Sequence, residues 1–431
     1  MSPKKSKSQK NILQAPKGMR DLLDDPFYMK QGFYEKAQEI AEYYGFSGIE
    51  LPILEHEEIF TKGVGDGTDI VDKEMYSLKT KGGDHLVMRP EGTAAAMRAY
   101  IEHGMGALPQ PVFIYYDGPF FRHERPQKGR YRQFYQFGLE IIGSPKAVLD
   151  AITIQTGYQI LKESGKDISV KINTLGDTEV RKEYLRELKS FYKKHKNSIS
   201  QKDLKRLETN PLRVLDSKEA DTIAVNEDAP TLIETLNKES KKHFKQVLEY
   251  LDAAHIPYEI DNTLVRGLDY YAHTVFEYVT YSEDGETSLA LGGGGRYDGL
   301  AKVMGHTKDV PAVGLALGVD RIIEIAKEGS FNPKIRKKPK FFFIQIGYEA
   351  KAKAFDIIEI MRKKRYPLKH SLSKNNLGKQ LAKAEESGIP YALIFGKKEA
   401  IDGTVIVRDM RTRKQKTVDI PKLADYIKTL K

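Results

Sequence analysis

The segment 111–142 constrains the fold of this chain more than any other part of the sequence. Residues 111–116 (PVFIYY), 119–124 and 131–142 (YRQFYQFGLEII) are rich in aromatic and β-branched residues, which favours three successive strands. Short polar loops join them, and the last of these loops is basic. Parallel neighbours would need a long crossover, usually a helix, between them. The segment therefore predicts a mainly antiparallel sheet.

The elements on either side of this segment follow from the spacing of apolar residues. That spacing predicts helices at 27–44 (stopping at Gly45), 93–102 and 319–327, strands at 47–54 and 85–89, and strand character again over 257–281. Residues from about 177 to 256 differ, because they are polar, helical in pattern and basic in patches. We interpret them as a helical insertion in the body of residues 11–330.

A second domain follows a linker. Residues 328–340 (EGSFNPKIRKKPK) contain two prolines, a glycine and five basic residues, and we place the linker itself at 331–340. Beyond it, predicted strands at 341–348, 366–372, 391–395 and 404–409 alternate with predicted helices at 349–364, 376–387 and 421–430. This alternation predicts a compact α/β domain at 341–431, which makes the whole chain an α+β protein.

The charge of the chain is unevenly distributed. The net charge is +10, but residues 1–10 carry +4, residues 331–340 carry +5 and residues 341–431 carry +10, so the body at 11–330 carries −9. A basic C-terminal third suggests a polyanionic partner, although a solvated lysine surface explains the charge equally well. Residues 1–10 are predicted to be a disordered basic tail.

Several classes of protein are excluded by composition. The chain has no cysteine, which excludes disulfides, thiolate metal sites and a cysteine nucleophile. Its longest apolar stretches, 312–319 and 341–346, are far shorter than the roughly 18 residues of a membrane span. The first residues, MSPKKSKSQK, precede no apolar segment and do not form a secretory signal. We expect a cytoplasmic protein without membrane contact.

Two short stretches place polar groups where chemistry is possible. In 88–93 (MRPEGT), Glu91 and Thr93 flank a glycine at a strand-to-helix turn, although Thr93 as an N-cap is the simpler explanation. In 121–140, strand alternation places Arg122 with Glu124 on one face, and the same alternation groups Phe134, Gln136, Gly138 and Glu140 on the next strand. Such a face could stack on a purine, neutralise phosphate and bind a polar substrate. A solvated hairpin is the alternative.

Three further stretches add arginines and glycines. Residues 264–271 (LVRGLDYY) contain Arg266, Tyr270 and Tyr271, and the four glycines at 292–295 allow a ligand to approach the backbone closely. This glycine run is neither a P-loop nor a dinucleotide-binding fingerprint. Residues 314–321 (GLALGVDR) predict a strand that leads into a helix with Arg321 in its first turn.

Together these motifs resemble the histidyl-tRNA synthetase family of class II aminoacyl-tRNA synthetases. The matching segments are PKGMRD (16–21), the motif 2 region at 121–140, RGLDYY (266–271), RYDGL (296–300) and the motif 3 segment at 318–321. Val319 and Asp320 stand where the family more often has Leu and Glu, and Tyr135 stands where histidine also occurs. The resemblance extends from about residue 12 to residue 431.

The resemblance implies a fold, a reaction and a set of partners. The fold would be a class II antiparallel-sheet catalytic core at 11–330 followed by an anticodon-binding domain at 341–431. The reaction would join L-histidine and ATP, accompanied by Mg²⁺, into histidyl-adenylate and then transfer the histidyl group to the 3′ end of tRNA(His). The family also implies a homodimer, with 16–21 and 27–44 close to the interface. No residue is assigned as a metal ligand.

The resemblance also implies roles for individual residues. Arg122 and Arg266 would be catalytic and would contact the α-phosphate of ATP. The remaining ATP contacts would come from Arg321 on the γ-phosphate and the adenine face, Phe134 on the other face of the ring, and Glu124 on the adenine amino edge. The histidine α-amino group would be bound by Glu91, Thr93 and Gln136, and its imidazole by Glu140 and Tyr271, with Tyr270 lining the pocket.

Two alternatives belong to the same structural class. One is a catalytic-core paralogue that acts as a regulatory subunit of ATP phosphoribosyltransferase in histidine biosynthesis. Such a chain typically lacks the anticodon domain and an intact RGLDYY peptide, both of which are expected here. The other is a class II synthetase for glycine, threonine or proline, which would lack RGLDYY.

Overall fold

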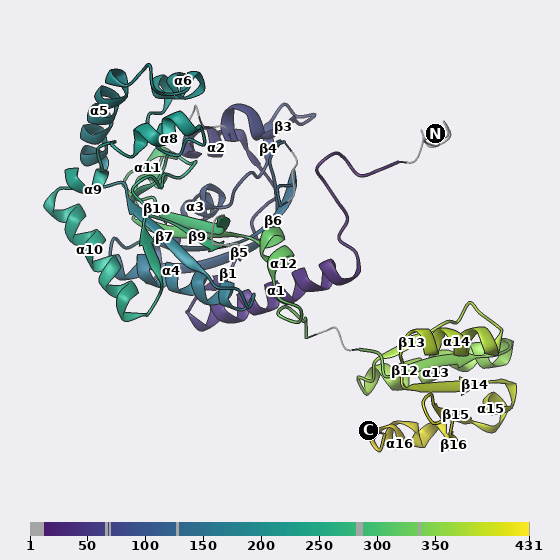
Figure 1. The fold of residues 1–431 in the computed structure, drawn as a ribbon. Coiled ribbons are helices and arrows are strands. Elements are labelled where there is room, and N and C mark those ends of the chain that lie inside the picture. The colour runs from purple at the N-terminus through teal and green to yellow at the C-terminus, as the bar shows by residue number, and fades with distance from the viewer. Residues whose placement is uncertain are drawn as a thin grey trace, which may run out of the picture. The chain divides into compact units, whose positions relative to one another are not determined.

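The computed structural model describes residues 13–64, 68, 70–125, 129–281, 288–334 and 338–430. The chain forms two compact units, one ending at Pro333 and the other beginning at Lys334 (Figure 1). The predicted tail at 1–10 and part of the predicted linker, residues 335–337, lie outside the described residues. The predicted α+β class is confirmed.

An eight-stranded sheet forms the centre of the first unit. Its order is β1 (Ser47–Gly48), β5 (Val112–Phe121), β6 (Gln133–Ile142), β11 (Ala312–Gly318), β10 (Ser288–Arg296), β9 (Ala272–Tyr281), β7 (Ser169–Thr174) and β8 (Tyr258–Ile260). The five pairings from β5 to β7 are antiparallel, and the outer pairs β1–β5 and β7–β8 are parallel. The predicted antiparallel sheet is therefore confirmed.

Two strand predictions near the start of this unit are wrong in their bounds. The predicted strand 47–54 is instead β1 and β2 (Leu54–His56), which belong to different sheets, with Pro52 in the connection between them. A proline has no backbone N–H to donate to a ladder. The predicted strands 111–116 and 119–124 are one strand, β5, because Asp117–Pro119 stay paired with β6. β2 joins β4 (His85–Met88) and β3 (Tyr76–Lys79) in a small antiparallel sheet.

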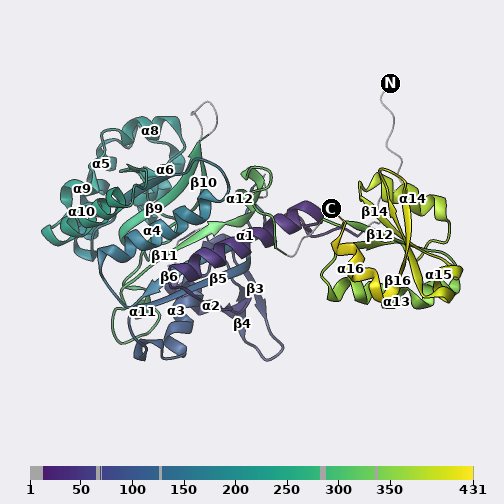
Figure 2. The same ribbon diagram turned by 90° about the horizontal axis from the view of Figure 1, so that it is seen from below.

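One face of the large sheet is covered by four helices. α1 (Asp24–Tyr43), α4 (Ala147–Lys162), α10 (Lys238–Ala253) and α12 (Val319–Ile325) contribute to one hydrophobic core with β6 and β11 (Figure 2). Phe137 and Leu139 of β6 point into this core. Neither α4 nor β7 was predicted from the sequence. Ten of the sixteen residues of α4 are buried, so its apolar residues form no narrow stripe of helical period.

The opposite face carries a second core and most of the helical insertion. It packs against α3 (Thr93–Glu102), α11 (Leu300–Val303) and helices α5 (Thr178–Lys194), α6 (Gln201–Thr209), α7 (Leu212–Leu215), α8 (Ala220–Asn226) and α9 (Leu232–Thr235). α2 (Glu57–Val64) and a π-helical turn (Ile70–Glu74) lie beside the small sheet, and a 3-10 turn (Met105–Ala107) follows α3. This core contains several buried tyrosines, among them Tyr116, Tyr271 and Tyr297, whose hydroxyl groups lie against this face of the sheet.

The second unit is a separate five-stranded sheet with its own core. Its order is β13 (Leu368–His370), β12 (Phe341–Gln345), β14 (Tyr391–Phe395), β15 (Thr404–Asp409) and β16 (Gln415–Asp419). Its helices are α13 (Tyr348–Lys363), α14 (Leu377–Glu386), α15 (Lys397–Asp402), a 3-10 turn (Ile420–Lys422) and α16 (Leu423–Lys428). The short elements α15 and β16 were not predicted. Among the described residues, no helix is long and apolar enough to cross a membrane.

Candidate active site

Glu91 lies at the start of α3, where β4 has just ended. Its carboxylate accepts hydrogen bonds from the backbone N–H groups of Thr93 (2.7 Å) and Ala94 (2.8 Å). The expectation that Thr93 caps this helix is wrong, because Thr93 is its first residue and Glu91 supplies the capping oxygen atoms. Burial raises the pKa of Glu91, and the two backbone donors oppose that rise. The turn therefore holds a carboxylate 4% exposed at the positive end of a helix.

The end of β5 and the start of β6 place an arginine over an aromatic ring. Arg122 Nε donates to the Pro90 carbonyl oxygen (2.9 Å), and its guanidinium carbon lies 5.3 Å from the centre of the Phe134 ring. Glu124 lies 4.0 Å from Arg122 and 3.7 Å from Arg130. The bond to Pro90 fixes the arginine stem, so the guanidinium group can face the cavity in a defined orientation.

Gln136 contributes an unsatisfied polar atom to the same surface. Its Oε1 atom is buried and has no hydrogen-bond partner among the described residues. A buried amide oxygen without a donor is costly, typically by about 1–3 kcal/mol, unless a ligand or water supplies the donor. Gln136 lies along β6 beyond Phe134 and lines the cavity with it. The atom is suited to accept from a bound N–H group.

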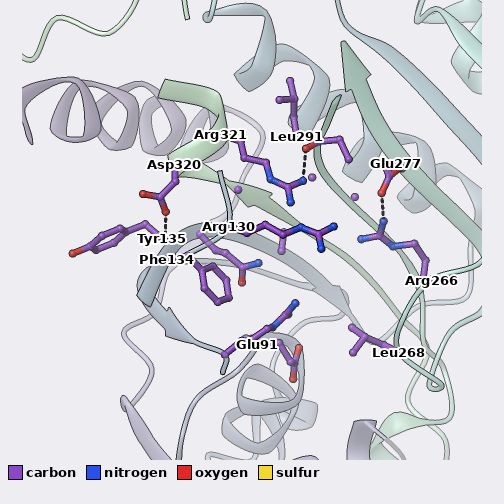
Figure 3. Close-up of a pocket in the computed structure, with 18 of the residues that line it drawn as sticks. Glu91, Arg130, Phe134, Tyr135, Arg266, Leu268, Glu277, Leu291, Asp320 and Arg321 are labelled. Atoms are coloured by element: carbon purple, nitrogen blue, oxygen red, sulfur yellow. Dashed lines mark hydrogen bonds and ion pairs between the residues drawn. The ribbon is translucent and has the colours of Figure 1, made fainter. Parts of the chain in front are cut away.

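The loop before β9 brings Arg266 into the cavity. Arg266 Nη1 donates to Glu277 Oε1 at 2.7 Å, and both side chains remain about one quarter exposed, at 23% and 26% (Figure 3). Glu277 was not predicted as a site residue. Its signal is a lone carboxylate in the otherwise apolar and aromatic strand β9 (AHTVFEYVTY). The ion pair fixes the guanidinium group while leaving it accessible from the cavity.

Arg321 closes the far side of the cavity. Its Nε donates to the Gly129 carbonyl oxygen (3.1 Å) and its Nη1 to that of Ala290 (2.8 Å). Burial lowers the pKa of Arg321, and the charge of Arg130 adds to that effect. Figure 3 shows Arg321, Arg130 and Arg266 extending toward one another. Like charges gathered in one hollow are costly without an anion, so the arrangement favours a polyanionic ligand.

Tyr270 and Tyr271 line the cavity next to Glu91. The Tyr270 hydroxyl lies 3.4 Å from Glu91 Oε2, and the two tyrosine rings are 4.7 Å apart. Burial raises the pKa of Tyr271 to about 12, so its hydroxyl keeps its proton at neutral pH. Both hydroxyls can therefore donate as well as accept hydrogen bonds.

Glu140 lies one layer behind the cavity wall. Its carboxyl group accepts hydrogen bonds from the hydroxyls of Thr93 (2.8 Å), Tyr116 (2.9 Å) and Tyr297. It is fully buried and is not among the lining residues, whereas Thr93 is. Burial raises the pKa of Glu140 to about 8, despite the three donors. Tyr116 and Tyr297 were not predicted as part of the site, since their hydroxyls reach it from β5 and from the segment after β10.

The N-terminal segment holds the loop between β5 and β6 in place next to the cavity. Arg20 donates to the Tyr131 hydroxyl (2.6 Å) and to Asp320 Oδ1 (2.9 Å), while Asp320 Oδ2 accepts from the Tyr135 backbone N–H (2.7 Å). The Arg132 backbone N–H donates to the Gly18 carbonyl oxygen at 2.7 Å. The PKGMRD segment is thus tied to both the hairpin and the start of α12.

The structure brings all but one of the predicted site residues into one cavity of about 220 Å³. Those that line it are Glu91, Thr93, Arg122, Glu124, Phe134, Gln136, Arg266, Tyr270, Tyr271 and Arg321, and Glu140 is the exception. The lining also includes Arg130, Tyr131, Glu277 and Asp320, which were not predicted as site residues. In the described part of the chain, no group of three or more acidic or histidine side chains is arranged to hold a metal ion.

The glycine run has a structural role as well as a place at the cavity. Gly292 and Gly293 line the cavity, as a close approach to a ligand would require. A Cβ on Gly294, however, would lie 1.9 Å from the Gly314 carbonyl oxygen on β11. The run therefore also allows β10 and β11 to pack without side chains between them.

Gly314 provides a test of how tightly Glu140 is enclosed. A Cβ there would lie 1.5 Å from Glu140 Oε2 and 2.7 Å from the Leu139 carbonyl oxygen. We expect Gly314→Ala to lower the free energy of unfolding by about 1–3 kcal/mol, as overpacking typically does. Gly82→Ala is the matched control, since its Cβ would meet only side-chain atoms at 3.5 Å or more. Denaturant unfolding of both variants measures this, and equal stabilities would contradict the enclosure.

The raised pKa of Glu140 predicts how stability changes with pH. A glutamate carboxyl has a pKa of 4.5 as its ordinary value, and in the folded protein this one has a pKa of about 8. Between these values the folded state keeps a proton that the unfolded state releases. The stabilisation is complete below about pH 4.5 and is lost as the pH rises through about 8.

Glu140→Gln removes this titration. The wild-type free energy of unfolding should therefore fall, relative to that of the variant, by up to roughly 1.4 kcal/mol per pH unit between pH 5 and 8. Guanidinium unfolding at several pH values gives the difference directly. A difference that does not change with pH would show that Glu140 titrates alike in the folded and unfolded states.

The fold and the cavity together define the class of protein. An antiparallel sheet that presents arginines, carboxylates and a stacking ring in one cavity, joined to a separate mixed-sheet unit, is the arrangement of a class II aminoacyl-tRNA synthetase. The family model described as "Histidyl-tRNA synthetase" matches residues 18–322, and the model described as "Anticodon binding domain" matches residues 340–430. The chain belongs to the histidyl-tRNA synthetase family.

Relatives with curated names match over almost their whole length. The chain is 38% identical to the histidine–tRNA ligase of Caldicellulosiruptor bescii, covering 96% of this chain and 98% of that protein. It is 39% identical to the histidine–tRNA ligase of Lactococcus lactis subsp. cremoris SK11, covering 94% of each. The crystal structure of apo S. aureus histidyl-tRNA synthetase aligns with a TM-score of 0.78 at 30% identity, covering 97% of this chain and 100% of that one.

Proposed function

We propose that the chain is a histidine–tRNA ligase that activates L-histidine with ATP and transfers it to the 3′ end of tRNA(His). The observation that carries this proposal is the single cavity that holds Arg122, Arg266 and Arg321 together with Glu91 and Gln136. Arginines suit a triphosphate, and a buried carboxylate beside a buried amide oxygen suits an ammonium group. Family membership then specifies which amino acid the cavity takes.

Activation requires an anionic carboxylate to attack an anionic phosphate. We assign Arg122 and Arg266 to the α-phosphate, where their charges offset this repulsion and stabilise the negative charge of the transition state. Each guanidinium group is already oriented, one by the Pro90 carbonyl oxygen and the other by Glu277. Little reorganisation is then needed at the moment of reaction. The C–O–P bond of the adenylate forms as the bond to pyrophosphate breaks.

We assign the adenine ring and the γ-phosphate of ATP to residues of the β5–β6 hairpin and of α12. Phe134 stacks on one face of adenine, and Arg321 covers the other face and contacts the γ-phosphate. Glu124 accepts from the adenine amino group. Phe134 and Arg321 both line the cavity, and Arg321 is held by two backbone carbonyl groups that fix its direction.

Histidine is assigned to the end of the cavity near α3. Glu91, Thr93 and Gln136 bind the α-amino group, which would satisfy the unpaired Gln136 Oε1 atom. Tyr271 meets the imidazole, and Tyr270 lines the pocket. The expected direct contact of Glu140 with the imidazole does not fit its position behind the wall. Among its three hydroxyl partners only Thr93 lines the cavity, so we assign Glu140 to orienting that hydroxyl. A ligand unable to use these polar groups leaves them unpaired, which gives strong discrimination.

ATP is a substrate that aminoacyl-tRNA ligases generally use with a divalent metal, and we propose that the metal here is Mg²⁺. Mg²⁺ takes oxygen ligands and often keeps one or two carboxylates together with phosphate. Because Glu124 is assigned to adenine and Glu277 holds Arg266, phosphate oxygens and water would supply most of its ligands. The ion would neutralise charge on the β- and γ-phosphates when it is bound.

The domains are assigned accordingly. We propose a catalytic core at 11–330, with a helical insertion at about 177–256 that contacts the acceptor stem, a linker at 331–340 and an anticodon-binding domain at 341–431. The last of these carries a charge of +10, which favours the phosphate backbone of tRNA. The proposed location is the cytoplasm, where a chain without cysteine needs no oxidising environment.

We further propose that the enzyme is a homodimer. Leu23 and Tyr43 at the ends of α1 are 70% and 90% exposed, and Ile53 and Leu54 nearby in the sequence are 45% and 43% exposed. Leu23 and Tyr43 lie at opposite ends of a 20-residue helix, so they add exposed apolar area along α1 without forming one patch, and the dimer is chiefly what membership of the family implies. Sedimentation equilibrium tests the proposal, because a mass near the 48.9 kDa of one chain would refute it.

The alternative is a regulatory subunit without ligase activity. It is disfavoured by the intact RGLDYY loop and by the second unit that matches the anticodon-binding model. The test of the proposed function is histidine-dependent exchange between ATP and labelled pyrophosphate. A regulatory subunit would bind histidine without exchange.

A further inference from the structure

The loop that carries Arg266, Tyr270 and Tyr271 is held from outside the cavity by the helical insertion. Arg181 of α5 donates through Nη1 to the backbone carbonyl oxygens of Asp269 (2.9 Å) and Tyr271 (3.1 Å). These carbonyl groups lie on either side of Tyr270. One guanidinium group therefore clamps the backbone on both sides of a residue that lines the cavity.

Two more insertion residues contact the loop, Asn210 again at Asp269 and Arg213 near its other end. Asn210 Nδ2 donates to Asp269 Oδ1 at 2.9 Å, and Arg213 Nη2 donates to the Gly267 carbonyl oxygen at 2.9 Å. Gly267 directly follows Arg266 in the chain. A small polar cavity of about 210 Å³ lies between Arg213 and this part of the loop, and Arg266 lines both it and the main cavity.

The start of α5, the helix that carries Arg181, is held in place by several hydrogen bonds. The Asp177 carboxylate caps α5 by accepting from the Glu179 and Val180 backbone N–H groups, at 3.0 and 2.9 Å. It also accepts from Asn237 Nδ2 at 2.6 Å, which links the start of α5 to the start of α10. Arg181 lies one turn into α5, so its position follows that of the insertion. Figure 1 shows α5 and α10 at the left of the first unit.

We propose that Arg181 and Arg213 are positioning residues through which the insertion sets the histidine pocket and the α-phosphate arginine, respectively. The proposal rests on the proposed histidine activation. Arg181 fixes the backbone beside Tyr270 and Tyr271, so it acts on histidine binding. Arg213 fixes the backbone beside Arg266, so it acts on the chemical step. Any ligand that moves the insertion would then change both through these contacts.

Steady-state pyrophosphate exchange separates the two effects. Arg181→Met should raise KM for histidine by about tenfold or more, with less than about a threefold change in KM for ATP. Arg213→Ala should instead lower kcat by about five- to tenfold and leave KM for histidine within about twofold. Arg181→Lys should recover part of the affinity, because an ammonium group can still donate to a carbonyl oxygen.

The control is Arg186→Met on the same helix. Arg186 is exposed, and among the described residues its side chain hydrogen-bonds only to the Lys182 carbonyl oxygen of its own helix, at 3.5 Å, so exchange should be unchanged. Unaltered histidine KM in a folded Arg181→Met protein would overturn the proposal. So would equal losses for ATP and histidine with no recovery in Arg181→Lys, which indicate a purely structural role. If Arg181→Met fails to fold, the kcat of Arg213→Ala decides, and a wild-type value overturns the proposal. Absence of exchange in the wild type would refute the proposed function instead.

Discussion

Arg266→Ala is expected to lower kcat for histidine-dependent pyrophosphate exchange by about 10²–10³-fold, the usual cost of removing one donor to a developing anion. The guanidinium group lies at the cavity, oriented by Glu277 at 2.7 Å, and it is not part of a hydrophobic core. Its loss should therefore leave the free energy of unfolding nearly unchanged. Exchange kinetics and denaturant unfolding of the purified variant measure the two quantities.

The ion pair with Glu277 makes a sharper experiment possible. Removing Arg266 alone leaves the Glu277 carboxylate beside the site of the phosphate, which adds repulsion to the loss of the donor. The double variant Arg266→Ala/Glu277→Ala removes that repulsion. If the missing donor causes the defect, the double variant should recover no more than about tenfold in kcat. Full recovery would mean that Arg266 serves only to neutralise Glu277, and wild-type activity of the single variant would contradict the assignment outright.

A chain that ends at Pro333 is expected to keep histidine activation and to lose most tRNA charging. The first unit has its own cores and contains every residue of the cavity. Exchange should therefore stay within about threefold of the full chain, whereas kcat/KM for charging should fall by about 10²-fold or more. The reason is that a second attached binding surface for the same RNA is lost, and with it the basic unit of charge +10.

The salt dependence of charging provides the control for the truncation. Phosphate contacts release counterions, so the full chain should show a steeper fall in charging with salt than the truncated chain does. Equal salt slopes would mean that the second unit makes no phosphate contacts. Full charging by the truncated chain would contradict the anticodon-binding role.

Much of the cavity could be predicted from local patterns. Alternation along β6 correctly groups Phe134 and Gln136 on the face opposite Phe137 and Leu139, because side chains in a strand point to alternate faces. The short loop between β5 and β6 likewise excludes parallel pairing of these two strands. These inferences depend only on the period of a strand and the length of its connections, so sequence alone supports them.

The depth of a residue below the surface could not be predicted in this way. Alternation places Glu140 on the correct face but does not show that three hydroxyls cover it. That depth depends on Gly314, which leaves space for the carboxyl group, and on Gly138, where a Cβ would lie 2.2 Å from the Tyr116 ring. Such clearances lie between residues of neighbouring strands and become visible only once the strands are paired.

Contacts between distant segments also escaped prediction. Arg266 was identified as a functional arginine, but its partner Glu277 became visible only once the loop and β9 were placed together. The same holds for Arg20, whose contact with Tyr131 crosses more than a hundred residues of chain. Helix α4 was missed for a different reason, since an almost wholly buried helix shows no amphipathic period.

The central claim is that this cavity activates histidine and no other standard amino acid at a comparable rate. Exchange of labelled pyrophosphate into ATP, measured on the purified full chain with each amino acid in turn, tests it most directly. We predict exchange with histidine that exceeds exchange with any other amino acid by about 10³-fold or more, because buried polar groups reject ligands that leave them unpaired. Absence of exchange with histidine in folded protein, or faster exchange with another amino acid, would contradict the account.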